Sequence, residues 1–321
     1  MLRDPIGSGE VIPSSRSAQG TGTVEWLTVS GAEARAWARQ TTSSMPFAPL
    51  LARTLRDAAS RTPPVIVVRG LPFSPEAPMT PYEGGVDLPA SRLTIRNLLA
   101  VVTCLGLHPV AYAGECASVL HTVCPEAKSR GKFSSRGFDA ALPFHTDYAD
   151  RPIDEPVTDR SPAAAALVFA VERAEPSVPM ECASVSRLLA QLSPEDIRIG
   201  RAEEFRVDVP DIFGGGSPRL RRLILPDGRI RLNLAKMTGE TARAKQVLGK
   251  IHDILSDNHL VEQIHVRRGD IVVMNNQRAI HRRASFTPRW DATDRYFIRM
   301  SAVRDPGAGL PADPLRPWMW L

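Results

Sequence analysis

The stretch Leu142–Asp150, which reads LPFHTDYAD, contains a His-x-Asp pattern at His145 and Asp147. In an extended strand the residues i and i+2 point to the same side, so we expect both side chains to project together from one strand. One imidazole beside one carboxylate makes two thirds of a 2-His-1-carboxylate site, which leaves coordination positions open and suits non-haem iron. A lone His-x-Asp triplet is more often a surface loop, so this interpretation needs a third ligand elsewhere in the chain.

A second stretch, Arg268–His281, supplies a candidate for that ligand. Its pattern predicts a strand, a turn and a further strand, with His281 at the end of the unit. The neutral imidazole of His281 can complete a ligand set with His145 and Asp147. The remaining five histidines lie outside both stretches and, taken singly, are more often ordinary surface or packed side chains: His108, His121, His252, His259 and His265.

Two arginines downstream of His281 bracket the start of a predicted strand. Arg295 and Arg299 are four positions apart, so they share one face of an extended chain. A guanidinium on a rigid strand is the preferred partner for a carboxylate, because its planar fork donates two parallel charge-assisted hydrogen bonds. The alternative interpretation is that both arginines are solvated charges on the strand face.

The composition limits the class of protein. The chain has 321 residues, of which 43% are hydrophobic, and this is enough for one large core. No apolar run reaches the length of a membrane span, the N-terminus lacks the apolar region of a signal peptide, and the four cysteines form no CxxC pair. A cytoplasmic protein with reduced thiols is therefore expected. The net charge of +5 comes without a long Lys/Arg block and with only 6% aromatic residues, so neither nucleic acid nor a membrane is an expected partner.

The order of patterns along the chain predicts an α+β fold. The polar segment 1–24 is expected to be disordered, residues 25–321 to form a single domain, and the polar loop 125–141 to act as a lid or binding loop. Helices are predicted at 31–40, 46–61, 91–105, 185–191, 194–199 and 239–256. Strands are predicted around His145 and at 65–70, 108–113, 120–124, 163–171, 181–184, 261–266, 270–274, 279–282 and 296–303, with a hairpin at 220–225 and 229–234. Many short strands with flanking helices indicate an antiparallel sandwich.

Three motifs together resemble the Fe(II)/2-oxoglutarate-dependent dioxygenases. The closest resemblance is to the clavaminate synthase-like branch of the taurine dioxygenase-like superfamily, which includes asparagine and arginine hydroxylases. The motifs are the His-x-Asp pattern, the segment 269–281 with its Asn-x-Arg-x-x-His ending, and the segment 286–295. In that branch the cosubstrate arginine follows the distal histidine by fourteen residues, as Arg295 follows His281 here. The resemblance spans about residues 60–305.

The resemblance implies a double-stranded β-helix (jelly roll) core with flanking helices and with iron at one open end. The iron ligands would be His145, Asp147 and His281, and Arg295 would pair with the distal carboxylate of 2-oxoglutarate. Fe(II), 2-oxoglutarate and O2 are therefore the expected cofactor and cosubstrates. Asp147 argues against the halogenating relatives, which resemble this site but lack the carboxylate.

Substrate recognition is implied at Arg299, which matches the arginine that relatives use for the substrate carboxylate, and at Asn233. Asn233 lies in the segment 231–235, where hydroxylases of basic amino acids carry Asp-x-Asp; both acids are absent here. A cationic side chain on the substrate would then lack an anionic partner in the protein. The alternatives are that this segment lies away from the pocket, or that Asp150 or Glu115 supplies the negative charge. We therefore expect a neutral substrate side chain to be preferred over arginine or lysine.

Two further departures from the family pattern concern the metal and the cosubstrate. Asp147 stands where the amino-acid-hydroxylating branch usually has glutamate, and a shorter carboxylate can change how a substrate amine is held. Met180 replaces the family's threonine that contacts 2-oxoglutarate, which puts one hydrogen bond to the cosubstrate in doubt.

These features predict an oxygenase that hydroxylates an unactivated carbon of a free amino acid, or of a metabolite derived from one, in bacterial specialised metabolism. The expected partner is a small molecule. A carrier-protein-bound aminoacyl substrate is one alternative, and desaturation or cyclisation at the same metal centre is another. A jelly-roll binding protein without catalysis is a third interpretation, which the complete ligand set disfavours.

Overall fold

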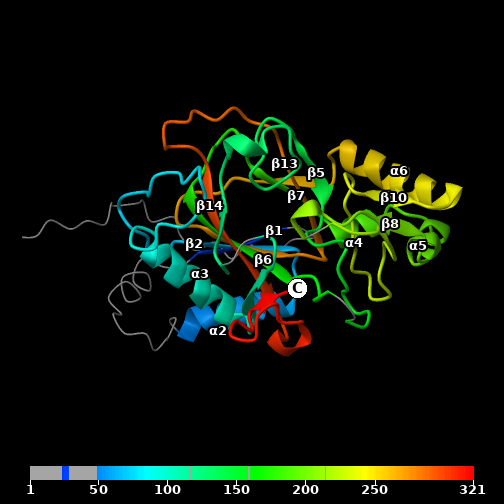
Figure 1. Ribbon diagram of the computed structural model, residues 1–321, viewed down its shortest axis with the longest axis horizontal. Coiled ribbons are helices and arrows are strands. Elements are labelled where there is room, and N and C mark those ends of the chain that lie inside the picture. Colours follow the sequence, from blue (N-terminus) through cyan, green and yellow to red (C-terminus); the bar gives the residue numbers. More distant parts are fainter. Residues whose placement is uncertain (1–23, 29–48, 116–117, 158–159, 214) are drawn as a thin grey trace, which may run out of the picture.

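The computed structural model describes residues 24–28, 49–115, 118–157, 160–213 and 215–321 (Figure 1). The segment 1–24 that was predicted to be disordered, apart from Val24, and the helix predicted at 31–40 lie outside the described residues. Among the helices that the structure describes, none is long and apolar enough to cross a membrane.

The largest sheet has eight strands. They are β1 (Val24–Thr28), β2 (Val65–Arg69), β3 (His108–Tyr112), β4 (His121–Val123), β6 (Ala166–Arg173), β12 (Ile271–Asn275), β14 (Tyr296–Val303) and β15 (Met319–Trp320). Seven of them follow the order β1-β2-β12-β6-β14-β3-β15, and β4 pairs with β14. The pairs β1–β2 and β3–β15 are parallel, whereas the pairs that join β2, β12, β6, β14, β3 and β4 are antiparallel.

Two smaller sheets complete the strand content. One has the order β11-β7-β13-β5, with antiparallel pairing throughout: β5 (Leu142–His145), β7 (Met180–Ser184), β11 (Val261–Ile264) and β13 (Ala279–Arg283). The other has the order β10-β8-β9 and is also antiparallel: β8 (Phe205–Val207), β9 (Arg219–Arg221) and β10 (Met237–Gly239). The structure therefore contains three mainly antiparallel sheets, as expected for a mixed fold.

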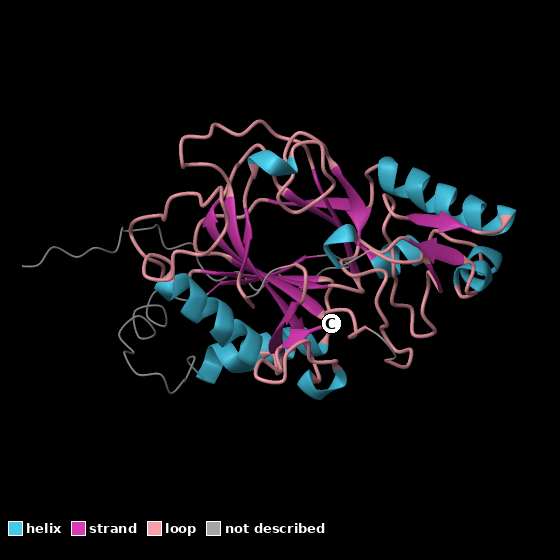
Figure 2. Cartoon of the chain, in the orientation of Figure 1, coloured by secondary structure: helices cyan, strands magenta, loops and turns pink. Residues whose placement is uncertain are grey.

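Helices cover the outer faces of the two larger sheets. They are α2 (Pro49–Ser60), α3 (Arg92–Cys104), α4 (Val185–Leu189), α5 (Pro194–Gly200) and α6 (Ala242–Ser256), with short 3-10 turns η1 (Ala127–Ser129), η2 (Asp211–Phe213) and η3 (Pro306–Ala308). Figure 1 shows α2 and α3 beside the largest sheet and α5 and α6 at the opposite end of the molecule, and Figure 2 shows the same layers by type of element.

Three hydrophobic cores hold these layers together. One lies between α2, α3 and the outer face of the largest sheet, and another lies between α4–α6 and the outer face of the β5-containing sheet. The third core joins the inner faces of these two sheets, for example Val272 and Met274 of β12 with Met180 and Cys182 of β7. Strands β6 and β12 are buried on both faces, which explains why their sequences read as continuous apolar runs.

The motif at Gly269 and Asp270 makes the turn that starts β12. Gly269 has a φ of +87°, a conformation that favours glycine. The buried Asp270 carboxylate accepts a hydrogen bond of 2.9 Å from the Arg267 backbone and one of 2.7 Å from the Arg69 guanidinium. These bonds attach the turn to β2, so β12 enters the sheet in a fixed register.

Most predicted elements are confirmed, with boundaries shifted by one to three residues, but the hairpin at 220–234 is only partly correct. Ile224 and Ile230 form an isolated antiparallel bridge around the tight turn at Gly228. The first predicted arm, 220–225, does not pair along its length with the second arm. Its beginning instead forms strand β9, which pairs with β8. Strands β1, β8, β10 and β15 were not predicted. The last three have only two or three residues, which are too few to show an alternation.

Candidate active site

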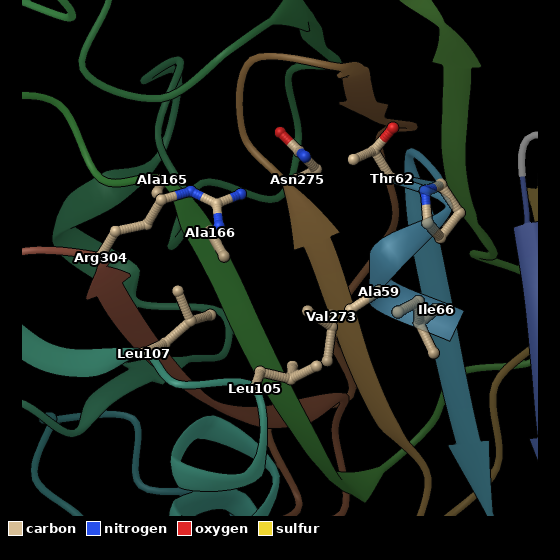
Figure 3. A pocket seen from close by; sticks show the side chains of 11 residues that line it. Ala59, Thr62, Ile66, Leu105, Leu107, Ala165, Ala166, Val273, Asn275 and Arg304 are labelled. Carbon is tan, nitrogen blue, oxygen red and sulfur yellow. The ribbon is translucent and has the colours of Figure 1, made fainter. Parts of the chain in front are cut away.

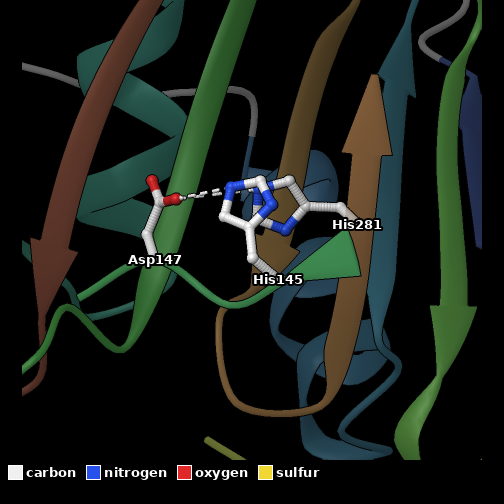
Figure 4. A group of neighbouring side chains, drawn as sticks. All are labelled: His145, Asp147 and His281. Carbon is white, nitrogen blue, oxygen red and sulfur yellow. Dashed lines mark ion pairs between the residues drawn. The ribbon is translucent and has the colours of Figure 1, made fainter. Parts of the chain in front are cut away.

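Strand pairing brings the two histidines together. β5 ends at His145, which lies opposite His281 of β13 in the antiparallel register. The two ring centroids are 4.2 Å apart, and Figure 4 shows both imidazoles beside the carboxylate of Asp147. The three side chains that the sequence singled out therefore meet at one point.

The prediction that His145 and Asp147 lie on one extended strand is wrong. β5 ends at His145, and Asp147 lies in the following turn, next to Tyr148 with its φ of +60°. The Asp147 carboxylate nevertheless lies beside both imidazoles. Its Oδ1 is 3.1 Å from Nε2 of His145 and 3.8 Å from Nε2 of His281. The turn, rather than the alternation of a strand, sets the position of the carboxylate.

The three side chains have the donor atoms that a divalent transition metal requires. One ligand atom from each residue lies within 4.8 Å of the other two. Nδ1 of His145 is 2.9 Å from the Pro143 carbonyl oxygen, and a proton held there would present the Nε2 lone pair to a metal. Burial lowers the pKa of His281 to about 3, so this imidazole is neutral. Three protein ligands leave coordination positions open for other molecules.

The turn that carries Asp147 is held by the side chain of Asn276. Asn276 is completely buried; its Oδ1 accepts a hydrogen bond of 2.8 Å from the Asp147 backbone nitrogen, and its Nδ2 donates bonds of 2.9 Å to the carbonyl oxygens of Asp147 and Ala164. On the other side, the backbone nitrogen of Thr146 donates to the Leu232 carbonyl at 2.7 Å. The carboxylate is therefore positioned by residues that do not touch the metal site.

We predict that Asn276→Ala lowers the affinity for Fe(II) by about 10- to 100-fold, because groups that orient metal ligands typically contribute that much. Anaerobic titration with Fe(II) measures the effect directly. Asn275→Ala is the matched control, since the Asn275 side chain bonds only to the Gln277 backbone nitrogen among the described residues. Unchanged iron affinity in a folded Asn276→Ala protein would mean that the turn holds its shape without this amide.

The metal-ligand cluster opens into a cavity of about 210 Å³. Part of its wall is apolar, with side chains from several elements: Val123, Leu142, Tyr148, Phe169, Met180, Ile212, Phe213 and Met274. The loop 125–141 also reaches the cavity through Phe133, Ser134 and Ser135. The charged lining consists of Glu115, Asp147, Glu181, Lys236, Arg282, Arg283, Arg295 and Arg299. Both predicted arginines thus face the same space as the three candidate ligands.

Arg295 is a buried cation without a compensating anion. Only 6% of the residue is exposed, and among the described residues its guanidinium has no hydrogen-bond or ion-pair partner. It stacks over the ring of Phe297, 4.1 Å from the ring centroid. Burial, together with the charge of Arg283, lowers the pKa of Arg295 to about 9. A buried, unpaired guanidinium is a ready binding site for a carboxylate.

Arg299, in contrast, is paired on both sides. Its guanidinium donates to Asp147 Oδ2 at 2.8 Å and to the Glu115 carboxylate, which also accepts a hydrogen bond of 2.7 Å from the Tyr148 hydroxyl. Burial raises the pKa of Asp147, but the His145 hydrogen bond and the charge of Arg299 outweigh burial and hold that pKa below its usual range. The two carboxylates stay ionised, and a substrate that binds Arg299 must share it with them.

The segment that was compared with the acidic segment of basic-amino-acid hydroxylases does line the cavity. Asn233 and Lys236 both line the cavity, whereas Ala235 is exposed and is not part of the cavity lining. Of the two acids considered as replacements, Glu115 lines the cavity but already serves Arg299 and Tyr148. Asp150 is buried outside the cavity lining.

Sequence reasoning gave no role to Asn276 and Tyr148, and it considered Glu115 only as an alternative source of charge. Asn276 was part of a motif, yet its contact with Asp147 spans 129 residues, which no local pattern reveals. The signal for Glu115 was weaker still, because it lies in the turn after β3 without any neighbouring motif.

A second cavity lies on the outer face of the largest sheet. It has about 80 Å³ and is lined mostly by apolar side chains of α2, β2, β6 and β12, as Figure 3 shows. Arg304 and Asn275 are the charged and amide groups at its edge. Among the described residues that line it, there is no group of neighbouring acid, base and nucleophile.

Comparisons with known proteins bear on the fold and the family. No family model matches the sequence. L-asparagine oxygenase from Streptomyces coelicolor is 27% identical over 248 residues, which cover 75% of this chain and 71% of the relative. Clavaminate synthase 2 from Streptomyces clavuligerus is 25% identical over 246 residues, which cover 73% of this chain and 72% of the relative.

Among solved structures, asparagine oxygenase in complex with Fe(II), 2S,3S-3-hydroxyasparagine and succinate matches with a TM-score of 0.77. The match covers 92% of this chain and 98% of that chain at 23% identity, so it bears on the fold alone. The sequence relatives and the cluster of two histidines and one aspartate add the chemistry. In sequence, fold and candidate metal ligands, this chain is therefore similar to the clavaminate synthase-like branch of the Fe(II)/2-oxoglutarate-dependent oxygenases.

Proposed function

We propose that this enzyme hydroxylates an unactivated carbon of a free amino acid, or of a metabolite derived from one, in bacterial specialised metabolism. One observation carries the proposal. The candidate ligands His145, Asp147 and His281 face the same cavity as Arg295, a buried guanidinium for which no other described residue provides an anion. A candidate metal site beside a buried guanidinium that can bind a carboxylate is what an oxygenase with a dicarboxylate cosubstrate requires.

His145, Asp147 and His281 are proposed to hold Fe(II), since two imidazoles and one carboxylate match the preference of this metal. With 2-oxoglutarate and O2, bound iron supplies the oxidant for breaking a C–H bond. The protein residues keep this oxidant away from water: Phe169, Met180 and Met274 form an apolar wall of the cavity. Met180 cannot donate a hydrogen bond to the cosubstrate, so the polar contacts must come from other residues.

Arg295 is proposed to bind the distal carboxylate of 2-oxoglutarate. Burial of the guanidinium strengthens this ion pair, because the low local dielectric reduces screening. Arg283 lines the same cavity and donates to the backbone carbonyl oxygens of Ala140 and Ala284. Its second positive charge attracts the same carboxylate while it keeps the end of the loop 125–141 attached to β13.

Arg299 and Asn233 are proposed to contact the prime substrate, with Arg299 facing its carboxylate. Glu115, bonded to Arg299, offers an acceptor for the substrate amine within the same cluster. An α-amino acid, with one anionic and one cationic group on the same carbon, matches this arrangement of charges. The geometry thus favours a free amino-acid head group as substrate.

We further propose that the two larger sheets form a double-stranded β-helix, with residues 25–321 as one domain and the loop 125–141 as a lid. Supporting this, one hydrophobic core joins the inner faces of both sheets, and Phe133, Ser134 and Ser135 of the loop line the cavity. Closure of such a loop would exclude water from the reaction.

Two measurements test the proposed function. Fe(II) and 2-oxoglutarate, added anaerobically, should produce the weak visible charge-transfer band of the chelate. With O2 present, an amino-acid substrate should then release succinate and gain one oxygen atom, detected by mass spectrometry. A product lighter by two hydrogens would indicate desaturation or cyclisation, and turnover only of carrier-bound aminoacyl groups would favour a carrier-protein partner. Absence of the band would indicate a binding protein without catalysis.

A further inference from the structure

We propose that the prime substrate carries a second anionic group and that Lys236 binds it, which makes dicarboxylic amino acids or their derivatives the preferred substrate class. This inference rests on the proposed function, because it assumes that an amino acid occupies the cavity. It revises the expectation from the sequence, which favoured a neutral side chain, since Lys236 lines the cavity.

The segment that carries Lys236 is fixed to the strand of the first metal ligand. The backbone nitrogen of Thr146 donates to the Leu232 carbonyl at 2.7 Å, and that of Leu234 donates to the Phe144 carbonyl at 3.1 Å. These bonds lie on both sides of His145, which forms an antiparallel bridge with Asn233. Lys236 follows within the same turn, where its backbone nitrogen donates to the Asn233 carbonyl at 3.1 Å. The lysine is therefore attached to the metal-binding strand by a short, hydrogen-bonded segment.

The Lys236 ammonium has no partner among the described residues, although the residue is half-buried. Two other cations of the cavity already have carboxylate partners: Arg282 donates to Glu181 at 2.9 Å, and Arg299 donates to Asp147 at 2.8 Å. Arg295 is assigned to the cosubstrate, and Arg283 donates to backbone carbonyl oxygens. An ammonium donates three hydrogen bonds and accepts none, so its preferred partner in a partly desolvated wall is an anion.

The charges of the cavity favour an anionic substrate. Its cationic side chains outnumber its carboxylates: they are Lys236, Arg282, Arg283, Arg295 and Arg299 against Glu115, Asp147 and Glu181. The carboxylates are already bonded to Arg282 or Arg299. Fe(II) and 2-oxoglutarate carry opposite charges of equal size, so their binding leaves the excess of cations unchanged. A cationic substrate side chain increases this excess of positive charge, and a neutral side chain leaves the excess unchanged. Only an acidic side chain reduces it.

Isosteric pairs of amino acids test this directly. L-aspartate and L-glutamate differ from L-asparagine and L-glutamine mainly in charge, and L-lysine and L-arginine carry the opposite charge. We expect the acids to be bound and turned over about tenfold better than their amides, or more, because a charge-assisted hydrogen bond replaces a neutral one. Succinate release gives turnover, and the shift of the anaerobic charge-transfer band on titration gives binding without turnover.

Variants of Lys236 separate its role from a general effect of charge. Lys236→Glu should reverse the order, so that lysine or arginine is preferred to glutamate, and Lys236→Met should reduce the ratio between acids and amides to about one. Lys245→Glu is the matched control, since Lys245 is exposed on α6 outside the cavity lining. The ratio should be unchanged in this control.

The outcomes distinguish this inference from the proposed function. If wild type forms the charge-transfer band but uses the amides as well as the acids, or if Lys236→Glu leaves the ratio unchanged, the role of Lys236 is refuted while the oxygenase stands. Failure of every amino acid in the panel to shift the band also overturns the inference. Absence of the band itself contradicts the proposed function instead.

Discussion

His281→Ala is expected to reduce turnover on the order of a thousandfold or more, equivalent to about 4 kcal/mol of transition-state stabilisation. The reason is geometric as well as energetic. His281 lies opposite His145 in the strand register, and its loss leaves one imidazole and one carboxylate, too few ligands for a defined coordination geometry. The same loss is expected for His145→Ala and Asp147→Ala.

Iron content after anaerobic loading and substrate-dependent succinate release are the measurements. His252→Ala, at an exposed position of α6, is the matched control and should retain both. Circular dichroism should show that the ligand variants keep the fold. Asp147→Ala is less direct than the histidine variants, because it also removes a partner of Arg299. Ample iron-dependent activity in any ligand variant would remove that residue from the ligand set.

Arg295→Ala is expected to weaken the binding of 2-oxoglutarate by roughly ten- to hundredfold, since a lost charge-assisted bond costs about 1.5–3 kcal/mol. The effect should appear in the Kd of the anaerobic chelate, read from its visible band, while iron affinity changes little. Arg295→Lys should recover only part of the affinity, because an ammonium lacks the planar fork.

Arg299→Ala provides the contrast, because Arg299 lines the same cavity and lies four residues along the same chain segment. In the Arg299→Ala variant, the Kd of 2-oxoglutarate should stay within a few-fold of the wild-type value, whereas the KM of the prime substrate should rise. If the two variants affected the opposite ligands, the roles proposed for these arginines would have to be exchanged.

The parts of the fold that follow from local patterns were predictable. The apolar runs of β6, β12 and β14 and the helical spacing of α3 and α6 matched the structure within a few residues. Shorter elements were not predictable, because a two-residue strand such as β15 has too few positions to show a period.

The candidate site shows the same division. The spacing of motifs identified His145, Asp147 and His281 as a set, but the backbone path was wrong, because the turn at Tyr148 depends on bonds from the distant Asn276. Likewise, the direction of the Lys236 side chain could not be predicted from the sequence. That direction depends on the pairing of Asn233 with His145, a contact between remote segments.

The pairing of β5 with β13 also has a consequence for folding. The two strands belong to remote parts of the chain, and the Asn276 contact that fixes Asp147 closes a separation of 129 residues. Contacts of high sequence separation form slowly, because the entropy of a large loop is lost before the contact is made. A nascent or partly folded chain thus lacks the metal site altogether. Iron held by the three proposed ligands would then bind only the native state and stabilise it by mass action, which would link metal supply to resistance to unfolding.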